Sequence, residues 1–245
     1  MLSARLFFLA LTFFGLYTSV LMAQKKYEQE IACNEFCAFD SVLFFQEVKP
    51  DDAWDKQTGL NTNLYGPYFN KFPQIRSDII SALKFYPELS NARIQFKYKS
   101  IKQTMNSRPA PGNIFRSKAH RRYIIIVNNN QGKHKGLPFE KLSFNIKIGW
   151  VGHELSHICE YESINNWETF WFAVKYIGSK EFVRKVERNT DLITIQHGLA
   201  FPLYDGIDYL FRNKDISEKY RKYARDNSLS LNEIRCFWCR SSHEK

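Results

Sequence analysis

Apolar positions in the middle of the chain follow a helical spacing. The sequence places an apolar residue at nearly every third or fourth position: Phe144, Ile148, Val151, Leu155 and Ile158. This period puts the side chains on one face of an α-helix, so we predict a helix through this stretch. Gly149 and Gly152 each weaken it by roughly 1 kcal/mol relative to alanine, and glycine is favoured where another backbone must come close. The two glycines are therefore compatible with a helix whose ligand-bearing turn is approached by another backbone.

Earlier segments predict one helix and two strands. Pro73 begins a helix with an apolar stripe that extends to about residue 85, because the missing N–H costs nothing at the first position. Residues 93–98 alternate polar and apolar side chains, as in a half-buried strand. Residues 122–127 form a continuous β-branched run that is typical of a central strand. The proline-rich residues 107–112 predict a turn or an exposed loop.

Helical patterns dominate the second half of the chain. The aromatic residues 165–172 predict a helix whose rings pack in the core. Ser179 is a favourable N-cap for the next helix, which we expect to end near Gly198. Two weaker patterns, at residues 216–223 and 229–237, predict packing helices without chemistry. Strands before the long helix and helices after it predict an α+β fold with the sheet on one side of the site.

Residues 1–23 predict an exported protein. Arg5 supplies a positive charge ahead of a long apolar run, and the small residue Ala23 marks a cleavage position. We expect a cleaved signal peptide, and therefore a secreted or periplasmic protein. An uncleaved membrane anchor, with association at a membrane surface, is the alternative. Turn signals predict a loop-rich extension over residues 24–71, followed by one domain over residues 72–245.

Export also bears on the five cysteines of the sequence. Cys33 and Cys37 lie near the start of the mature chain, and Cys236 and Cys239 lie near its end. An oxidising compartment favours disulfides, which either join the two ends or close each pair locally. A four-cysteine zinc site also has suitable spacing, but exported thiols tend to oxidise, so we favour disulfides. Cys159 is the remaining cysteine, and we expect it to pack as a small buried apolar residue.

The formal net charge of the chain is +10, from 35 Lys and Arg against 25 Asp and Glu. No run of five or six like charges occurs, so the basic character is spread out. The densest local group comprises Arg116, Lys118, Arg121, Arg122, Lys133 and Lys135. No signature of a nucleic-acid-binding fold accompanies this group. We therefore predict a solvated basic face and no nucleic-acid partner.

The sequence His-Glu-Leu-Ser-His at residues 153–157 is a HExxH motif. Four residues turn a helix by about 400°, so His153 and His157 project from one face, one turn apart. Two imidazoles placed in this way can bind one Zn²⁺ at about 2.0–2.1 Å each. Glu154 points slightly aside, where it can act as the general base that deprotonates a water. The motif therefore predicts a catalytic zinc centre.

A catalytic zinc needs a third protein ligand. Glu160 is excluded because a straight helix carries it roughly 10 Å along the axis from His153. Glu187 and Asp191 are spaced i, i+4 on one face of a later helix. One of the two can bind the metal, and the other can accept the second ring N–H of a ligating histidine. An ordinary exposed helix with charges is the alternative.

Hydrolysis of a peptide bond also needs a donor for the negative charge that develops on the carbonyl oxygen. His197 lies ten residues past Glu187, near the end of the same predicted helix, and is our candidate for this catalytic role. A capping or packing histidine is the simpler alternative, and Tyr204 and Tyr209 are other candidate donors.

The HELSH motif followed by a Glu-x-x-x-Asp helix resembles the gluzincin metallopeptidases, in particular those related to the CAAX prenyl protease type. The resemblance implies a zincin-like fold, with a small sheet ahead of the HExxH helix and a second ligand-bearing helix after it. It implies Zn²⁺ bound by His153, His157 and Glu187. It also implies Glu154 as general base and Asp191 as the hydrogen-bond partner of a ligating histidine.

The motifs that carry this resemblance cover about residues 143–200 and are also similar to small exported bacterial zincin-like proteins. Prenyl proteases cross the membrane several times, whereas this sequence has one long apolar run, at its N-terminus. We therefore expect an exported zinc-dependent peptidase that hydrolyses a peptide or protein substrate. A non-catalytic zincin-like protein, serving in binding or in the structure of the cell envelope, is the alternative.

Overall fold

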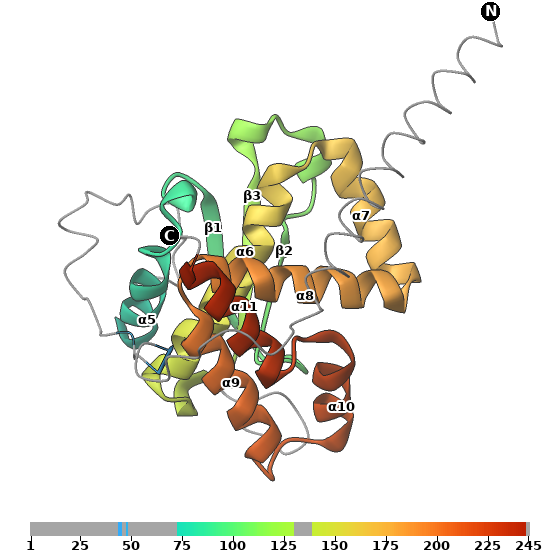
Figure 1. Cartoon of the computed structure of the whole chain (residues 1–245). Coiled ribbons are helices and arrows are strands. Elements are labelled where there is room, and N and C mark those ends of the chain that lie inside the picture. The colour runs from blue at the N-terminus through green and yellow to red at the C-terminus, as the bar shows by residue number, and fades with distance from the viewer. Residues whose placement is uncertain (1–43, 46–47, 49–72, 130–138, 244–245) are drawn as a thin grey trace, which may run out of the picture. The chain divides into compact units, whose positions relative to one another are not determined.

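The computed structural model describes residues 44, 45, 48, 73–129 and 139–243 (Figure 1). The predicted signal peptide and most of the predicted extension over residues 24–71 lie outside this part of the chain. The described residues form an α+β fold, as the sequence predicted, in which a small mixed sheet accompanies a larger set of helices. These residues fall within one compact unit that begins at position 39.

The sheet has three described strands in the order β1-β3-β2. Strand β1 (Arg93–Lys99) pairs in parallel with β3 (Arg122–Asn128), and β2 (Met105–Pro109) pairs antiparallel to β3 on its other side. Every residue of β3 except the first is buried, which confirms the predicted central strand. In β1 the polar and apolar positions alternate as expected, with Ile94 and Phe96 buried.

Strand β2 is the part of the sheet that the sequence did not predict. We expected a turn or exposed loop at residues 107–112, but Ser107 and Arg108 pair with β3, and the chain turns only afterwards, through Gly112 with a φ of 81°. A strand at a sheet edge tolerates proline, because one side of its backbone needs no partner. Pro109 can therefore end this edge strand, and the proline-rich composition concealed it.

Helix α6 (Phe144–Ser163) carries the HExxH motif and lies at the centre of the packing (Figure 1). Its apolar stripe is fully buried, with Ile148, Val151 and Leu155 each 0% exposed, in one core with the sheet and with α5 (Pro73–Leu83). Helix α6 also contacts α8 (Lys180–Gln196), α9 (Ala200–Arg212) and β2. The predicted helix is therefore confirmed, and its buried face joins the elements that surround it.

The two glycines of α6 mark where other chain segments approach it. A Cβ at Gly149 would lie 2.2 Å from the carbonyl oxygen of Pro202, and one at Gly152 would lie 2.4 Å from Cδ1 of Leu199. Real Cβ atoms do not come this close to other heavy atoms, so glycine is required at both positions unless the neighbours move. The segments that approach α6 are α9, through the backbone of Pro202, and the preceding residue Leu199, through its side chain.

The remaining helices, α7 to α11, follow one another along the chain with short connecting segments. Helix α7 (Asn166–Gly178) begins with a capping box, and α8 begins at Ser179, whose side chain accepts a hydrogen bond from the Phe182 N–H. Helix α8 ends at Gln196 with His197 as its C-cap, and Gly198 follows with a φ of 84°, close to the predicted end. Helices α10 (Glu218–Asn227) and α11 (Leu231–His243) match the two predicted tail helices. Helix α9 was not predicted.

The predicted core packing of the aromatic residues of α7 is wrong for the exposed Trp167, Phe170 and Trp171, whereas Phe172 packs against the core. No residue of α7 is buried, and Trp167 and Ile177 are 67% and 89% exposed. The helix contacts α8 and the short 3₁₀ helix η3 (Asn113–Phe115), and its outer face is exposed among the described residues.

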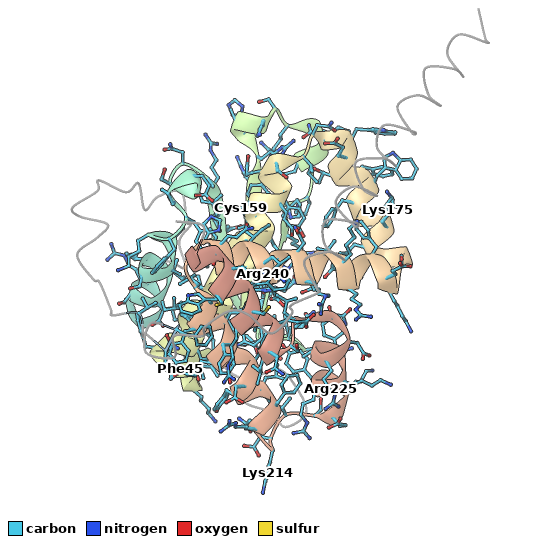
Figure 2. The ribbon with its side chains drawn as sticks, viewed as in Figure 1. Phe45, Cys159, Lys175, Lys214, Arg225 and Arg240 are labelled. Atoms are coloured by element: carbon cyan, nitrogen blue, oxygen red, sulfur yellow. The ribbon has the colours of Figure 1, made fainter. Side chains whose placement is uncertain are left out.

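The basic residues of the described part of the chain are spread over the surface, apart from Arg121 and Arg188, which are buried. Lys175 of α7, Lys214 between α9 and α10, and Arg225 of α10 lie in separate regions (Figure 2). The predicted basic face is wrong for Arg121, which is 6% exposed and donates to the carbonyl oxygens of Tyr161 and Ile164 at 2.9 and 2.8 Å. This guanidinium satisfies the C-terminal end of α6. Lys133 and Lys135 lie outside the described residues.

Cys236 and Cys239 are disulfide-bonded, whereas Cys159 is free. Since Cys33 and Cys37 lie outside the described residues, the choice between local and end-to-end bridges stays open. Within the described part of the chain, no helix is both long enough and apolar enough to cross a membrane.

Replacement of Gly149 by alanine should destabilise the fold, because the new Cβ meets the backbone of α9. We expect Gly149→Ala to lower the free energy of unfolding by about 1–3 kcal/mol, as for other overpacked sites. Gly178→Ala is the matched control, since no described atom lies within 4 Å of its added Cβ. Urea denaturation should show the control at or slightly above the original stability. Equal midpoints for the two variants would refute the close approach.

Candidate metal centre

Helices α6 and α8 bring four predicted residues together. His153 and His157 project from one face of α6, and both are 6% exposed. Glu187 and Asp191 project from α8, which packs against α6. One side-chain atom each from His153, His157 and Glu187 lies within 4.8 Å of the other two. The i, i+4 spacing on each helix therefore produces one cluster, as expected from the sequence.

Distances within the cluster suit a shared cation better than direct hydrogen bonds. Glu187 Oε2 lies 3.4 Å from His153 Nε2 and 3.8 Å from His157 Nε2. A good N–H···O hydrogen bond spans about 2.7–3.2 Å, so both distances are long for one. Two ligands at about 2.0–2.1 Å from a tetrahedral zinc are separated by about 3.3–3.4 Å. The distances from Glu187 Oε2 to the two histidines are therefore close to the spacing that a bound zinc would require.

The second ring nitrogen of each histidine, Nδ1, already has a hydrogen-bond partner. His153 Nδ1 lies 2.9 Å from Asp191 Oδ1, and since a carboxylate accepts, the ring donates. His157 Nδ1 lies 3.0 Å from Thr190 Oγ1 and 3.3 Å from Glu160 Oε2. Both imidazoles are thereby fixed with Nδ1 as the donor and Nε2 turned toward Glu187. Such outer partners orient ligating histidines and make them better ligands.

Glu187 is oriented by a residue that the sequence did not indicate. The Tyr176 hydroxyl of α7 donates to Glu187 Oε1 at 2.5 Å. This contact occupies one carboxylate oxygen and leaves Oε2 for the two histidines. Tyr176 lies eleven residues before Glu187 on a different helix, so no local spacing could have indicated the pair. Thr190 also escaped notice, although its position between Glu187 and Asp191 places it on the same helix.

Charge distribution in the metal-free cluster follows from these contacts. Burial opposes a charge on His153, but hydrogen bonds and attraction to Asp191 and Glu187 outweigh it and hold its pKa well above the usual value. Burial also opposes a charge on His157, and its contacts with Glu160 and Glu187 nevertheless raise its pKa to about 9. Burial would raise the pKa of Glu187, yet the two histidines hold it well below its usual range. The carboxylates around the two histidines therefore stabilise positive charge at this centre.

Glu154 lies beside this cluster with an unused oxygen. Its side chain is 5% exposed, and Oε2 has no hydrogen-bond partner among the described residues. A buried carboxylate oxygen without a partner is costly, so a donor is expected at this position. A water at the open side of the histidine and glutamate ligands would supply one. The residues present therefore fit a catalytic metal with one open position.

A cavity of about 560 Å³ opens over the cluster and includes His153, Glu154, His157 and Glu187 in its wall. Apolar side chains from several helices form much of the rest: Trp150, Phe170, Phe172, Ile177, Leu203 and Ile207. Phe170, Phe172 and Ile177 belong to α7, so this aromatic helix forms part of the cavity wall. Residues 106–109 of the edge strand β2 also line it.

Two further predicted residues lie elsewhere or act differently. His197 is not among the residues that line the cavity; its Nε2 lies 2.7 Å from Glu88 Oε1. Glu160 is not a member of the cluster, in keeping with its exclusion as a ligand, but it accepts from Thr190 at 2.7 Å and faces His157 Nδ1. The alternative donors Tyr204 and Tyr209 do not line the cavity either.

No protein-family model matches the chain, and no curated protein or solved structure matches it either. The resemblance to gluzincins therefore stays a prediction from the motifs. The chemistry open to the site follows from its own geometry.

Replacement of Glu187 and Asp191 should separate a ligand from an orienting residue. Glu187→Gln should remove bound zinc almost completely, because the neutral amide cannot supply a negatively charged ligand to the metal. Asp191→Asn should weaken zinc binding by about 10–100-fold, the usual cost of losing an outer partner. Competition with a fluorescent zinc indicator measures both affinities. A larger loss in Asp191→Asn than in Glu187→Gln would reverse the assignment.

Zinc binding should release protons near neutral pH. Because the pKa of His157 is raised to about 9 and that of His153 is also raised, both rings carry an Nε2 proton that the metal must displace. We expect at least one proton released per zinc, with affinity rising with pH up to about 9. Calorimetry in buffers of different ionisation enthalpy counts these protons. Binding without proton release at neutral pH would contradict the protonated state of the two rings.

Proposed function

We propose that the chain is a zinc-dependent peptidase of gluzincin type with a zincin-like fold. The observation that carries this proposal is the convergence of His153, His157 and Glu187, with one ligand atom each within 4.8 Å of the others, beside a buried Glu154 oxygen without a partner among the described residues. Two histidines and a glutamate with an open fourth position are the ligand set of catalytic rather than structural zinc. A purely structural site would have no use for Glu154.

The proposed chemistry assigns one task to each residue. Zinc, when bound, supplies Lewis acidity that lowers the pKa of a water and polarises a carbonyl group. His153, His157 and Glu187 would hold it, with Asp191 and Tyr176 fixing two of these side chains. Glu154 Oε2 accepts a proton from the water as the water oxygen bonds to the carbonyl carbon, and it donates that proton to the leaving nitrogen as the C–N bond breaks. This proton transfer completes the hydrolysis of the peptide bond.

A peptide substrate is supported by the strand at the cavity wall. Among the described strands, β2 lies at an edge of the sheet, and its residues 106–109 line the cavity. The outer edge of such a strand offers backbone N–H and C=O groups to an extended peptide. The apolar walls given by α7 and α9 favour apolar side chains in that peptide. The cavity therefore suits an extended, partly apolar peptide.

A tyrosine is the better candidate for the donor role that we expected of His197. Tyr223 of α10 lines the cavity, whereas His197 does not. Burial, followed by the nearby charge of Glu187, raises the pKa of Tyr223, so its hydroxyl keeps its proton and can donate. We assign it to the carbonyl oxygen of the substrate.

An exported location is supported by two independent features. The sequence begins with a charged and then apolar segment of signal-peptide type. Cys236 and Cys239 are both disulfide-bonded, and disulfides persist in oxidising compartments. The proposed enzyme would therefore act outside the cytoplasm, as a secreted or periplasmic protein.

The general-base assignment is tested by Glu154→Gln, which keeps the shape of the side chain and removes its basicity. We expect zinc content to remain at the original level and hydrolysis of a peptide library to fall at least 100-fold, within the range for general-base catalysis. Glu181→Gln, at an exposed position in the first turn of α8, is the matched control and should keep full activity.

Mass spectrometry of the digested library, with and without a chelator, provides the readout. If Glu154→Gln cleaves as fast as the original protein, the mechanism is wrong. If the zinc-loaded original protein cleaves nothing, a non-catalytic binding or structural role is favoured instead.

A further inference from the structure

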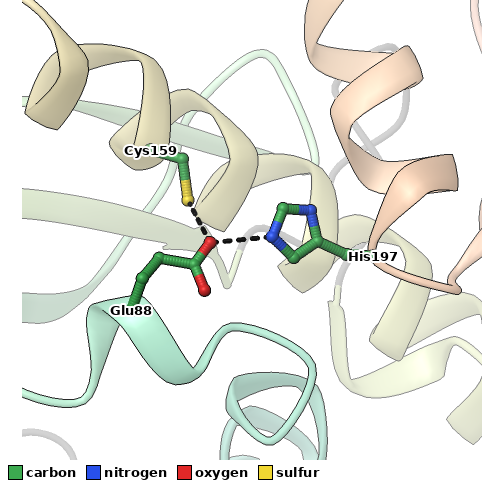
Figure 3. A group of neighbouring side chains, drawn as sticks. All are labelled: Glu88, Cys159 and His197. Atoms are coloured by element: carbon green, nitrogen blue, oxygen red, sulfur yellow. Dashed lines mark hydrogen bonds and ion pairs between the residues drawn. The ribbon is translucent and has the colours of Figure 1, made fainter.

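A second group of metal-binding side chains lies apart from the cavity. Glu88, Cys159 and His197 come from three different elements and converge on one point (Figure 3). Glu88 belongs to the 3₁₀ helix η2 (Pro87–Leu89), Cys159 belongs to α6, and His197 is the C-cap of α8. One side-chain atom of each lies within 4.8 Å of the other two. None of the three lines the cavity of the first centre.

His197 is held in the orientation that a ligating histidine needs. Its Nδ1 lies 2.8 Å from the carbonyl oxygen of Ile193, and since a carbonyl can only accept, Nδ1 carries the proton. Its ring stacks on the buried Tyr86, with centroids 4.2 Å apart and planes 13° apart. Nε2 is therefore directed at Glu88. A ring nitrogen bonded to a backbone carbonyl, with the other left for the ion, is the usual arrangement at metal sites.

Distances among the three side chains are close to those around one tetrahedral ion. Cys159 Sγ lies 3.3 Å from Glu88 Oε1, and His197 Nε2 lies 2.7 Å from the same oxygen. Bonds of about 2.3 Å to sulfur and 2.0–2.1 Å to nitrogen or oxygen would separate the ligand atoms by about 3.3–3.6 Å. Of these two distances, the one between His197 and Glu88 must widen. Glu88 is 47% exposed and can move that far.

We propose that Glu88, Cys159 and His197 form a second metal site, for Zn²⁺ or another divalent ion that accepts sulfur, nitrogen and oxygen ligands. The exposed side of the cluster leaves a fourth position for water. The alternative without a metal is an ion pair between Glu88 and His197, with the Cys159 thiol donating a hydrogen bond to the same oxygen. A metal accounts for all three, and it would protect the free thiol of an exported protein from oxidation.

The position of this site gives it a structural role. Cys159 follows His157 by two residues, about 200° around α6, so the two candidate centres occupy opposite sides of one helix. His197 likewise ends the helix that carries Glu187. A metal at the second site would tie η2, α6 and the end of α8 together behind the first centre. Binding of a metal at the second site does not require peptidase activity at the first centre.

Cobalt loading of the full, oxidised chain tests the proposal, because the two centres differ in sulfur. The first centre has no thiolate, whereas the second has one, so only the second gives a thiolate-to-cobalt charge-transfer band in the near ultraviolet. We expect this band to appear with the second site filled, and to be lost in Cys159→Ser. Zinc should also slow the reaction of the Cys159 thiol with a disulfide reagent by at least tenfold.

Two further variants keep the outcomes distinct. Glu187→Gln should abolish binding at the first centre and keep the charge-transfer band, whereas His197→Gln should weaken the band and leave the first centre filled. Metal content should fall from two equivalents to one in Cys159→Ser. Absence of the band in the original protein, or its persistence in Cys159→Ser, would overturn the second site. Loss of peptidase activity alone would leave it unaffected.

Discussion

A buried hydrogen bond between two helices determines how the candidate centre is built. His153 of α6 donates to Asp191 of α8 at 2.9 Å, and Asp191 is 1% exposed. The other oxygen of Asp191 accepts from the backbone N–H of Leu229, just before α11, so one carboxylate connects three segments. Removal of one partner from such a buried pair commonly costs about 3–5 kcal/mol. This contact fixes both the orientation of the imidazole and the alignment of Glu187 with the two histidines.

A second network of hydrogen bonds, on Tyr86, Ser156 and Thr194, also joins α6 to α8. Tyr86 donates to the carbonyl oxygen of Gly152 at 2.8 Å, its hydroxyl also contacts Ser156, and Ser156 contacts Thr194 of α8. These groups are buried and joined to one another, so α6 and α8 are held together on both sides of the cluster. The ring of Tyr86 also stacks on His197, which couples this network to the second candidate site.

Local sequence patterns predicted much of the fold and most of the candidate ligands, because these depend on spacing within one helix. The period of α6, the cap at Ser179 and the i, i+4 pairs on α6 and α8 required no knowledge of distant contacts. The misses depend on such contacts. Strand β2 exists because β3 pairs with it, α9 packs against the glycines of α6, and Glu88 meets His197 across 109 positions of sequence. Spacing alone could not show that His197 faces away from the cavity.

We propose that one zinc ion lies between the facing helices α6 and α8. Anomalous diffraction at the zinc edge from crystals of the zinc-loaded protein tests it most directly. We expect a peak about 2.0–2.1 Å from His153 Nε2, His157 Nε2 and Glu187 Oε2, with Glu154 outside the ligand shell. A zinc-loaded crystal without a peak between these atoms, or with Asp191 in place of Glu187 as the ligand, would contradict it.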